Sequence, residues 1–247
     1  MRNAKFSLML LLAGAFAGTI YSVETLEDVH SEDIAIQLYN SGNCDKAFRA
    51  FQNIAGKGNA TAQYFLGRMC FHGEGTEKDY AKAFEWYQKA ATGGNSEAQV
   101  CLGRMYSLGQ GTVKDFDKAM EWFQKSASQG NIRGEYWLAC GYYKIQKNYQ
   151  KAIGLFQNSA EQGNSDAQYC LACMYYYGEG TEKDFKLAMK WFKAAAEQNV
   201  AAAQYNIGVM YLKGESVIKS EGIAKQWFKK ASENNYPEAD AALAKLH

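Results

Sequence analysis

Residues 62–69 read Ala-Gln-Tyr-Phe-Leu-Gly-Arg-Met, and the pattern returns along most of the chain. Similar or divergent copies begin at Ala98, Gly134, Ala167, Ala203 and Ala239. From residue 62 onward the starting points are spaced by 36, 36, 33, 36 and 36 positions. A period of this length is typical of stacked two-helix repeats, each of which buries its apolar face against its neighbours.

Each unit is predicted to hold two helices. In the first helix, Ala62, Leu66 and Met69 share one face at helical spacing. A small residue recurs on this helix and would let the second helix approach closely: Gly67, Gly103, Ala139, Ala172 and Gly208. The second helix alternates large and small side chains, as in Trp86, Tyr87, Ala90 and Ala91. Such alternation suits interdigitation between stacked helices.

Turn residues separate the helices at regular places. Second helices are expected to end in a left-handed residue at Gly94, Gly130, Gly163, Asn199 and Asn235. Loops such as Gly73-Glu-Gly75 resemble phosphate cradles, but no strand precedes them, so we interpret their glycines as turn residues. Asp79, Asp115 and Asp184 then cap the second helices. With one proline, 23 glycines and few strand-forming runs, the chain is predicted to be all-α.

At this period, the recurring Leu-Gly, Met-Tyr, Gly-x-Gly, Lys-Asp, Lys-Ala and Trp-Phe resemble the Sel-one-like repeat family, a relative of the tetratricopeptide repeat. The resemblance implies a right-handed α-solenoid of stacked antiparallel helix pairs over residues 33–247. The units would be 33–59, 60–95, 96–131, 132–164, 165–200 and 201–236, with a C-terminal cap helix at 237–247. Unit 132–164 departs from the pattern because it lacks Gly-x-Gly and has Leu155 in place of tryptophan.

The N-terminus differs from the array. Two basic residues precede an apolar run from Phe6 to Ala17, so residues 1–22 are predicted to be a signal peptide, cleaved after Ala17 or Ser22. A signal anchor is the alternative, although the run is short for a membrane span. Residues 23–32 are expected to form an acidic leader. The protein would be exported to the periplasm or secreted, with no membrane insertion after cleavage.

The charge of the mature chain excludes one class of partner. Without the basic residues of the signal peptide, 25 basic residues stand beside 26 acidic ones. This near-balance argues against a nucleic-acid partner. The three histidines, His30, His72 and His247, form no metal or triad spacing, so no cofactor, no metal and no enzymatic activity are predicted.

Six cysteines lie in the chain, mainly in first helices. We interpret them chiefly as small buried side chains, with a disulfide from Cys140 to Cys170 or Cys173 as the alternative. Equivalent positions on neighbouring helices lie about 8–10 Å apart between axes, which is far for an easy bridge.

Stacked first helices would line a long concave groove. Placing the tetratricopeptide groove positions on this chain selects these candidates for partner binding: Tyr64, Arg68, His72, Arg104, Tyr136, Tyr143, Tyr169, Tyr176 and Tyr177. Tyrosine and arginine dominate binding hot spots, and Arg68 with Arg104 would suit a carboxylate or acidic peptide. The leading hypothesis is an exported, non-catalytic scaffold that binds a protein or peptide in cell-envelope processes or host contact. The alternatives are a cell-wall or β-lactam hydrolase, which rests on the resemblance alone, and a spacer that works through its convex face. The oligomeric state stays open.

Overall fold

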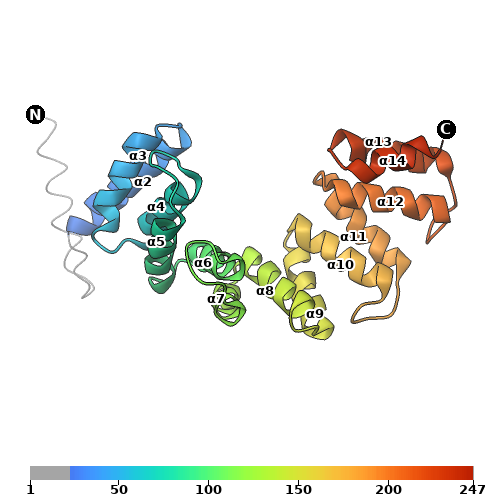
Figure 1. Cartoon of the computed structure of the whole chain (residues 1–247), viewed down its shortest axis with the longest axis horizontal. Coiled ribbons are helices and arrows are strands. Elements are labelled where there is room, and N and C mark those ends of the chain that lie inside the picture. The colour runs from blue at the N-terminus through green and yellow to red at the C-terminus, as the bar shows by residue number, and fades with distance from the viewer. Residues whose placement is uncertain (1–22, 247) are drawn as a thin grey trace, which may run out of the picture.

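The computed structural model describes residues 23–246, and within this range every regular element is a helix. Six antiparallel pairs follow one another along an arc and a last helix closes the array (Figure 1). The pairs are α2 (Val23–Asn40) with α3 (Cys44–Ala55), α4 (Ala60–His72) with α5 (Tyr80–Thr92), α6 (Ser96–Leu108) with α7 (Phe116–Ser128), α8 (Ile132–Lys144) with α9 (Tyr149–Glu161), α10 (Ser165–Tyr177) with α11 (Phe185–Glu197), and α12 (Ala201–Lys213) with α13 (Glu221–Glu233), and α14 (Pro237–Ala244) follows. The predicted all-α solenoid of stacked helix pairs is confirmed.

The N-terminal boundary differs from the expected one. Helix α2 begins at Val23, so residues 23–32 belong to the first helix and do not form a separate leader. The physical reason is that no glycine or proline interrupts residues 23–40, and a helix continues until such a residue ends it. The predicted signal peptide, residues 1–22, lies outside the described residues.

Polar caps begin the helices as the turn pattern predicted. The side chains of Asp79, Asp115 and Asp184 each accept a hydrogen bond from a backbone N–H in the first turn of a second helix. Asparagine does the same for most first helices, at Asn59, Asn95, Asn131 and Asn164. The reversal before each of the last five first helices has a positive φ, at Gly94, Gly130, Gly163, Asn199 and Asn235. These caps satisfy backbone donors that a helix end leaves unpaired.

The core contains a ladder of buried rings at one repeated position of the second helix: Phe51, Tyr87, Phe123, Phe156, Phe192 and Phe228. The ring packs directly on the small residue of the first helix. A Cβ added to Gly103 would lie 2.6 Å from the Phe123 ring, and one at Gly208 would lie as close to Phe228. This contact is the reason that the small residue recurs, as predicted.

The Gly-x-Gly loops join consecutive units. The hydroxyl of Tyr39 donates to Oε2 of Glu74 at 2.5 Å, and that of Tyr143 donates to Glu179 at the same distance, in each case from one unit to the loop of the next. The second loop glycine also lies against the preceding unit, because a Cβ on Gly111 would be 2.1 Å from the carbonyl oxygen of Tyr80. The glycines therefore serve close approach between units as well as the turn.

A buried glutamine fixes most unit boundaries. At the fourth residue of four first helices, the side-chain amide donates to a carbonyl eight residues earlier, at the end of the preceding second helix: Gln63, Gln99, Gln168 and Gln204. In unit 132–164 this position is Glu135. Burial raises the pKa of the Glu135 carboxyl above its ordinary value. An ionised carboxylate has no proton to donate, so this boundary lacks the bond that the other four make.

We expect Glu135→Gln to raise the free energy of unfolding at pH 7 by about 1 kcal/mol, the usual contribution of one hydrogen bond. Because the folded-state pKa of Glu135 is raised, the folded state holds the proton more tightly than the unfolded state. The wild type should therefore gain stability as the pH falls through the folded pKa towards the unfolded value, and the variant should lack that gain. Urea unfolding at pH 7 and pH 5 measures both effects. Glu85→Gln, at an exposed position, is the control; an equal or lower stability of Glu135→Gln at pH 7 would contradict the prediction.

Candidate functional site

One hollow lies among three consecutive first helices. It is a cavity of about 320 Å³ that α4, α6 and the start of α8 enclose, with one residue from α5 and one from a loop. We call it the arginine pocket. Its lining residues are Tyr64, Arg68, Phe71, His72, Tyr87, Cys101, Arg104, Met105, Gln110 and Arg133. The surface formed by α4, α6, α8, α10 and α12 is called the first-helix face below.

Helical spacing places the side chains of α4 in the pocket. Tyr64, Arg68 and His72 follow one another at four-residue steps, so they lie on one face of the helix. Arg104 occupies on α6 the position that Arg68 occupies on α4, 36 residues earlier. Repetition of the unit thus brings two arginines to neighbouring positions of one hollow.

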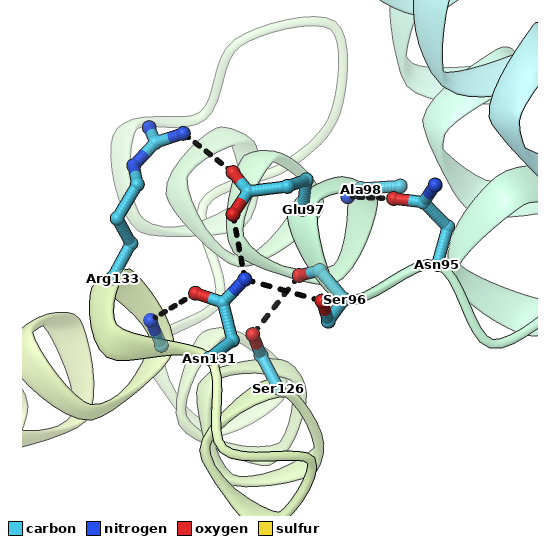
Figure 2. A network of polar contacts seen from close by, with 8 residues as sticks. Asn95, Ser96, Glu97, Ala98, Ser126, Asn131 and Arg133 are labelled. Atoms are coloured by element: carbon cyan, nitrogen blue, oxygen red, sulfur yellow. Dashed lines mark hydrogen bonds and ion pairs between the residues drawn. The ribbon is translucent and has the colours of Figure 1, made fainter.

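A polar network holds the third arginine. Glu97 accepts from a terminal nitrogen of Arg133 at 2.6 Å, and its other oxygen accepts from the side-chain amide of Asn131, also at 2.6 Å (Figure 2). Asn131 also caps α8 through the N–H of Gly134 and donates to the hydroxyl of Ser96. This network neutralises Arg133 and ties unit 96–131 to the start of α8.

The other two arginines lie over aromatic rings. The guanidinium carbon of Arg68 is 5.3 Å from the centroid of the Tyr39 ring, and that of Arg104 is 5.0 Å from the centroid of the Trp137 ring. Nε of Arg104 is buried without a hydrogen-bond partner, one of two such atoms among the side chains described from residue 31 to residue 246. Ring stacking leaves the edge of a guanidinium group, where its N–H donors lie, open to an acceptor.

The pKa of Arg68 reflects this environment. Burial by itself would lower the pKa, but interactions with Tyr39, Tyr64 and Glu74 raise it above the ordinary value. The carboxylate of Glu74 accepts a hydrogen bond from the Tyr39 hydroxyl. Arg68 therefore lies beside a carboxylate that is hydrogen-bonded to Tyr39, and it remains cationic. A positive charge is therefore secured in the pocket.

The structure separates the nine candidate residues into two groups. Tyr64, Arg68, His72 and Arg104 line the arginine pocket. The tyrosines further along make contacts within the array: Tyr143 donates to Glu179, the hydroxyl of Tyr176 accepts from Lys213 at 2.7 Å, and the rings of Tyr136 and Tyr169 pack on buried phenylalanines. Tyr177 is 59% exposed and packs edge-on against Tyr176.

Sequence reasoning missed Arg133 and Gln110, which complete the pocket. Arg133 belongs to the divergent unit and has no counterpart at the same position of the regular units, so the repeat pattern could not select it. Asn131, two residues before it, was the available signal, because asparagine is a preferred residue at a helix start and Asn131 caps α8.

A second hollow lies where unit 132–164 lacks its loop. It is a mostly apolar cavity of about 250 Å³ whose lining includes Phe116, Met120, Trp137 and Ile145. Phe116 is 39% exposed, whereas a loop glycine of the next unit approaches the corresponding Tyr149 closely. The missing loop therefore exposes apolar surface.

The six cysteines are free thiols in the structure, so the alternative of a bridge from Cys140 to Cys170 or Cys173 is not seen. Burial raises the pKa of Cys140 and Cys170, and raises that of Cys173 to about 11, so the three remain protonated at neutral pH. These properties agree with the interpretation as small, largely buried side chains. No group of three or more metal-binding side chains occurs among residues 31–246, whose side chains the structure describes. Nor is any helix among residues 23–246 long and apolar enough to cross a membrane.

Two-helix units in regular succession, with a hollow formed by three first helices, place the protein among helical-repeat solenoids. The chain belongs to the Sel1 repeat family, whose model matches residues 60–95, 96–131, 133–164, 165–200 and 201–236. The match leaves out the first helix pair, which the structure stacks on the array in the same way.

Solved structures show the same fold. A Sel1 repeat protein from Oxalobacter formigenes is 31% identical, with a TM-score of 0.78 over 84% of this chain and 86% of that one. The protective antigen c5321 of uropathogenic Escherichia coli is 28% identical, with the same TM-score over 90% of this chain. Our chain covers 49% of that antigen, about half its length. No curated protein matched the sequence.

Proposed function

We propose that the protein is an exported scaffold that binds an extended segment of another protein along its first-helix face. Sel1 repeat proteins are generally protein-interaction scaffolds. The observation that carries the proposal is the arginine pocket, because three units build it together and it lies on the face that the candidate residues share. Aromatic and arginine side chains in a hollow are the common anchors of protein interfaces.

Export is supported by the sequence of residues 1–22, in which basic residues precede a short apolar run. Expression of the full chain in its organism of origin, followed by cell fractionation and mass spectrometry of the N-terminus, tests it. We expect mature protein outside the cytoplasm that begins at Gly18 or Val23. An intact N-terminus on cytoplasmic protein would refute export.

The hydrolase alternative gains no support from the pocket. Cys101 and His72 both line it, and a thiol with an imidazole is a pair that some hydrolases use. Burial raises the pKa of Cys101, however, whereas a nucleophilic thiol needs a lowered one. The pocket suits binding better than catalysis.

Site-specific photo-crosslinking tests where the partner binds. Leu108 and Tyr177 are both 59% exposed and hold the position in their first helices that His72 holds in α4. A photoreactive amino acid at either site, in the full chain in its own cells, should crosslink a discrete partner. The same group at Gln124, an exposed position on α7, should not. Crosslinks to the same partner from Gln124 alone would move the function to the opposite face.

A further inference from the structure

The side chains that line the arginine pocket carry a net positive charge. The lining includes three arginines and no acidic residue. Glu97 neutralises Arg133 through the 2.6 Å ion pair, which leaves Arg68 and Arg104 as the cations with no carboxylate hydrogen-bonded to them. The mature chain has almost equal numbers of acidic and basic residues, so its overall composition does not account for three arginines in one hollow. The charge of the lining therefore favours an anion over a cation.

The two arginines also have donors to offer. One face of each guanidinium lies over an aromatic ring, so the group is held while its edge remains able to donate. The buried Nε of Arg104 has no acceptor within the protein. An oxygen acceptor that enters the pocket satisfies this donor once the arginine side chain rotates towards it. Planar guanidinium edges match the two oxygens of a carboxylate in bidentate geometry.

We infer that the arginine pocket binds a carboxylate of a peptide partner between Arg68 and Arg104. This inference rests on the proposed scaffold function and names the chemistry of its partner. Of the two guanidinium groups that remain after Arg133 is paired, that of Arg68 also lies beside the carboxylate of Glu74. The remaining net charge suits one singly charged carboxylate better than a phosphate dianion. The carboxylate comes either from an acidic side chain or from the end of a chain. The neighbouring Tyr64 hydroxyl and Gln110 amide supply polar contacts to the flanking peptide backbone.

The test uses the full chain and synthetic octapeptide libraries. One library has both ends blocked and a fixed central glutamate, and its twin has glutamine there. A second library lacks acidic side chains and ends in a free carboxylate, and its twin ends in an amide. A phosphoserine version of the first library completes the set. Binding of the selected peptides is measured by fluorescence anisotropy at two salt concentrations.

The variants separate hydrogen bonding from charge. Arg68→Gln/Arg104→Gln removes both cations, and Arg68→Lys/Arg104→Lys keeps the charge without the planar fork. Arg49→Gln/Lys193→Gln removes two exposed charges that do not line the pocket. Circular dichroism and the urea midpoint verify that each variant folds.

We expect at least one carboxylate library to bind better than its neutral twin, and the preferred library identifies the source. Affinity should fall about tenfold or more in the glutamine variant, since a lost charged hydrogen bond has that effect. The lysine variant should recover only part of it, and the Arg49→Gln/Lys193→Gln control should bind as the wild type does. Equal binding of acidic and neutral twins, unchanged affinity in the glutamine variant, or tighter binding of the phosphoserine library would overturn the inference.

The crosslinking experiment distinguishes this failure from failure of the proposed function. If a partner crosslinks at Leu108 or Tyr177 equally well in Arg68→Gln/Arg104→Gln, the scaffold function stands and the carboxylate pocket is wrong. If neither position crosslinks in the wild type, the first-helix face is not the binding surface. The two ideas therefore fail through different results.

Discussion

Replacing Phe123 by alanine is expected to lower the free energy of unfolding by about 3–5 kcal/mol, the range for deleting a buried phenylalanine ring. Phe123 is 4% exposed and its ring lies against Gly103, which has no side chain with which to fill the space. The cavity would therefore collapse only partly. Urea denaturation followed by circular dichroism measures the change. Phe116→Ala on the same helix, where the ring is 39% exposed, should cost about 1 kcal/mol or less.

The position of a substitution along the array affects the width of the unfolding transition as well as its midpoint. Each unit contacts only its neighbours, so an internal defect weakens the coupling between the two flanking parts. We expect Phe123→Ala to broaden the transition, whereas Phe228→Ala in the last full unit should mainly loosen the C-terminal end. Identical slopes and equal midpoint shifts for the two variants would show that the array unfolds as a single unit.

Asn131→Ala is expected to lower the free energy of unfolding by about 2–3 kcal/mol, which is more than the loss of a helix cap alone would cause. A cap alone is worth about 1 kcal/mol, but the Asn131 amide also donates to Glu97 at 2.6 Å and to Ser96 at 3.1 Å (Figure 2). A hydrogen bond to a charged group contributes about 1.5–3 kcal/mol. The substitution removes the cap of α8 and its tie to the preceding unit at the same time.

Asn95→Ala is the matched control, because Asn95 caps α6 by the equivalent bond, which it accepts from the N–H of Ala98 (Figure 2). Its side chain makes no other hydrogen bond to residues 31–246. It should cost about 1 kcal/mol. Thermal and urea unfolding of the two variants side by side measures the difference. Equal losses would mean that the network around Glu97 contributes little to stability.

Local rules account for most of the fold. The 36-residue period, the capping residues and the glycines with positive φ are short-range features, and each could be read from a few neighbouring residues. The small residue opposite each buried ring was predicted for the same reason, since Gly103 and Gly208 recur at one position of the unit. The acidic composition of residues 23–32 predicts a separate leader, whereas α2 begins at Val23 because no helix-breaking residue stands in this segment.

The candidate site was predicted only in part. Arg68, His72, Tyr64 and Arg104 fall at repeated positions of one helix face, so periodicity placed them together. Periodicity also selects Tyr143 and Tyr176 as groove residues, but their hydroxyls form hydrogen bonds with Glu179 and Lys213 of the next unit. Whether a repeated tyrosine is available to a partner depends on its neighbours in space, which a one-dimensional pattern does not contain.

The sequence by itself determined that this protein is a stack of two-helix repeats, because helix periodicity, capping and turns depend on residues a few positions apart. The tertiary structure alone decided that Glu97 neutralises Arg133, that Arg104 retains an unsatisfied donor, and that the missing loop of unit 132–164 exposes Phe116. The physical reason is that charge compensation and burial depend on distances between side chains of different units. Those distances are set only when the helices pack.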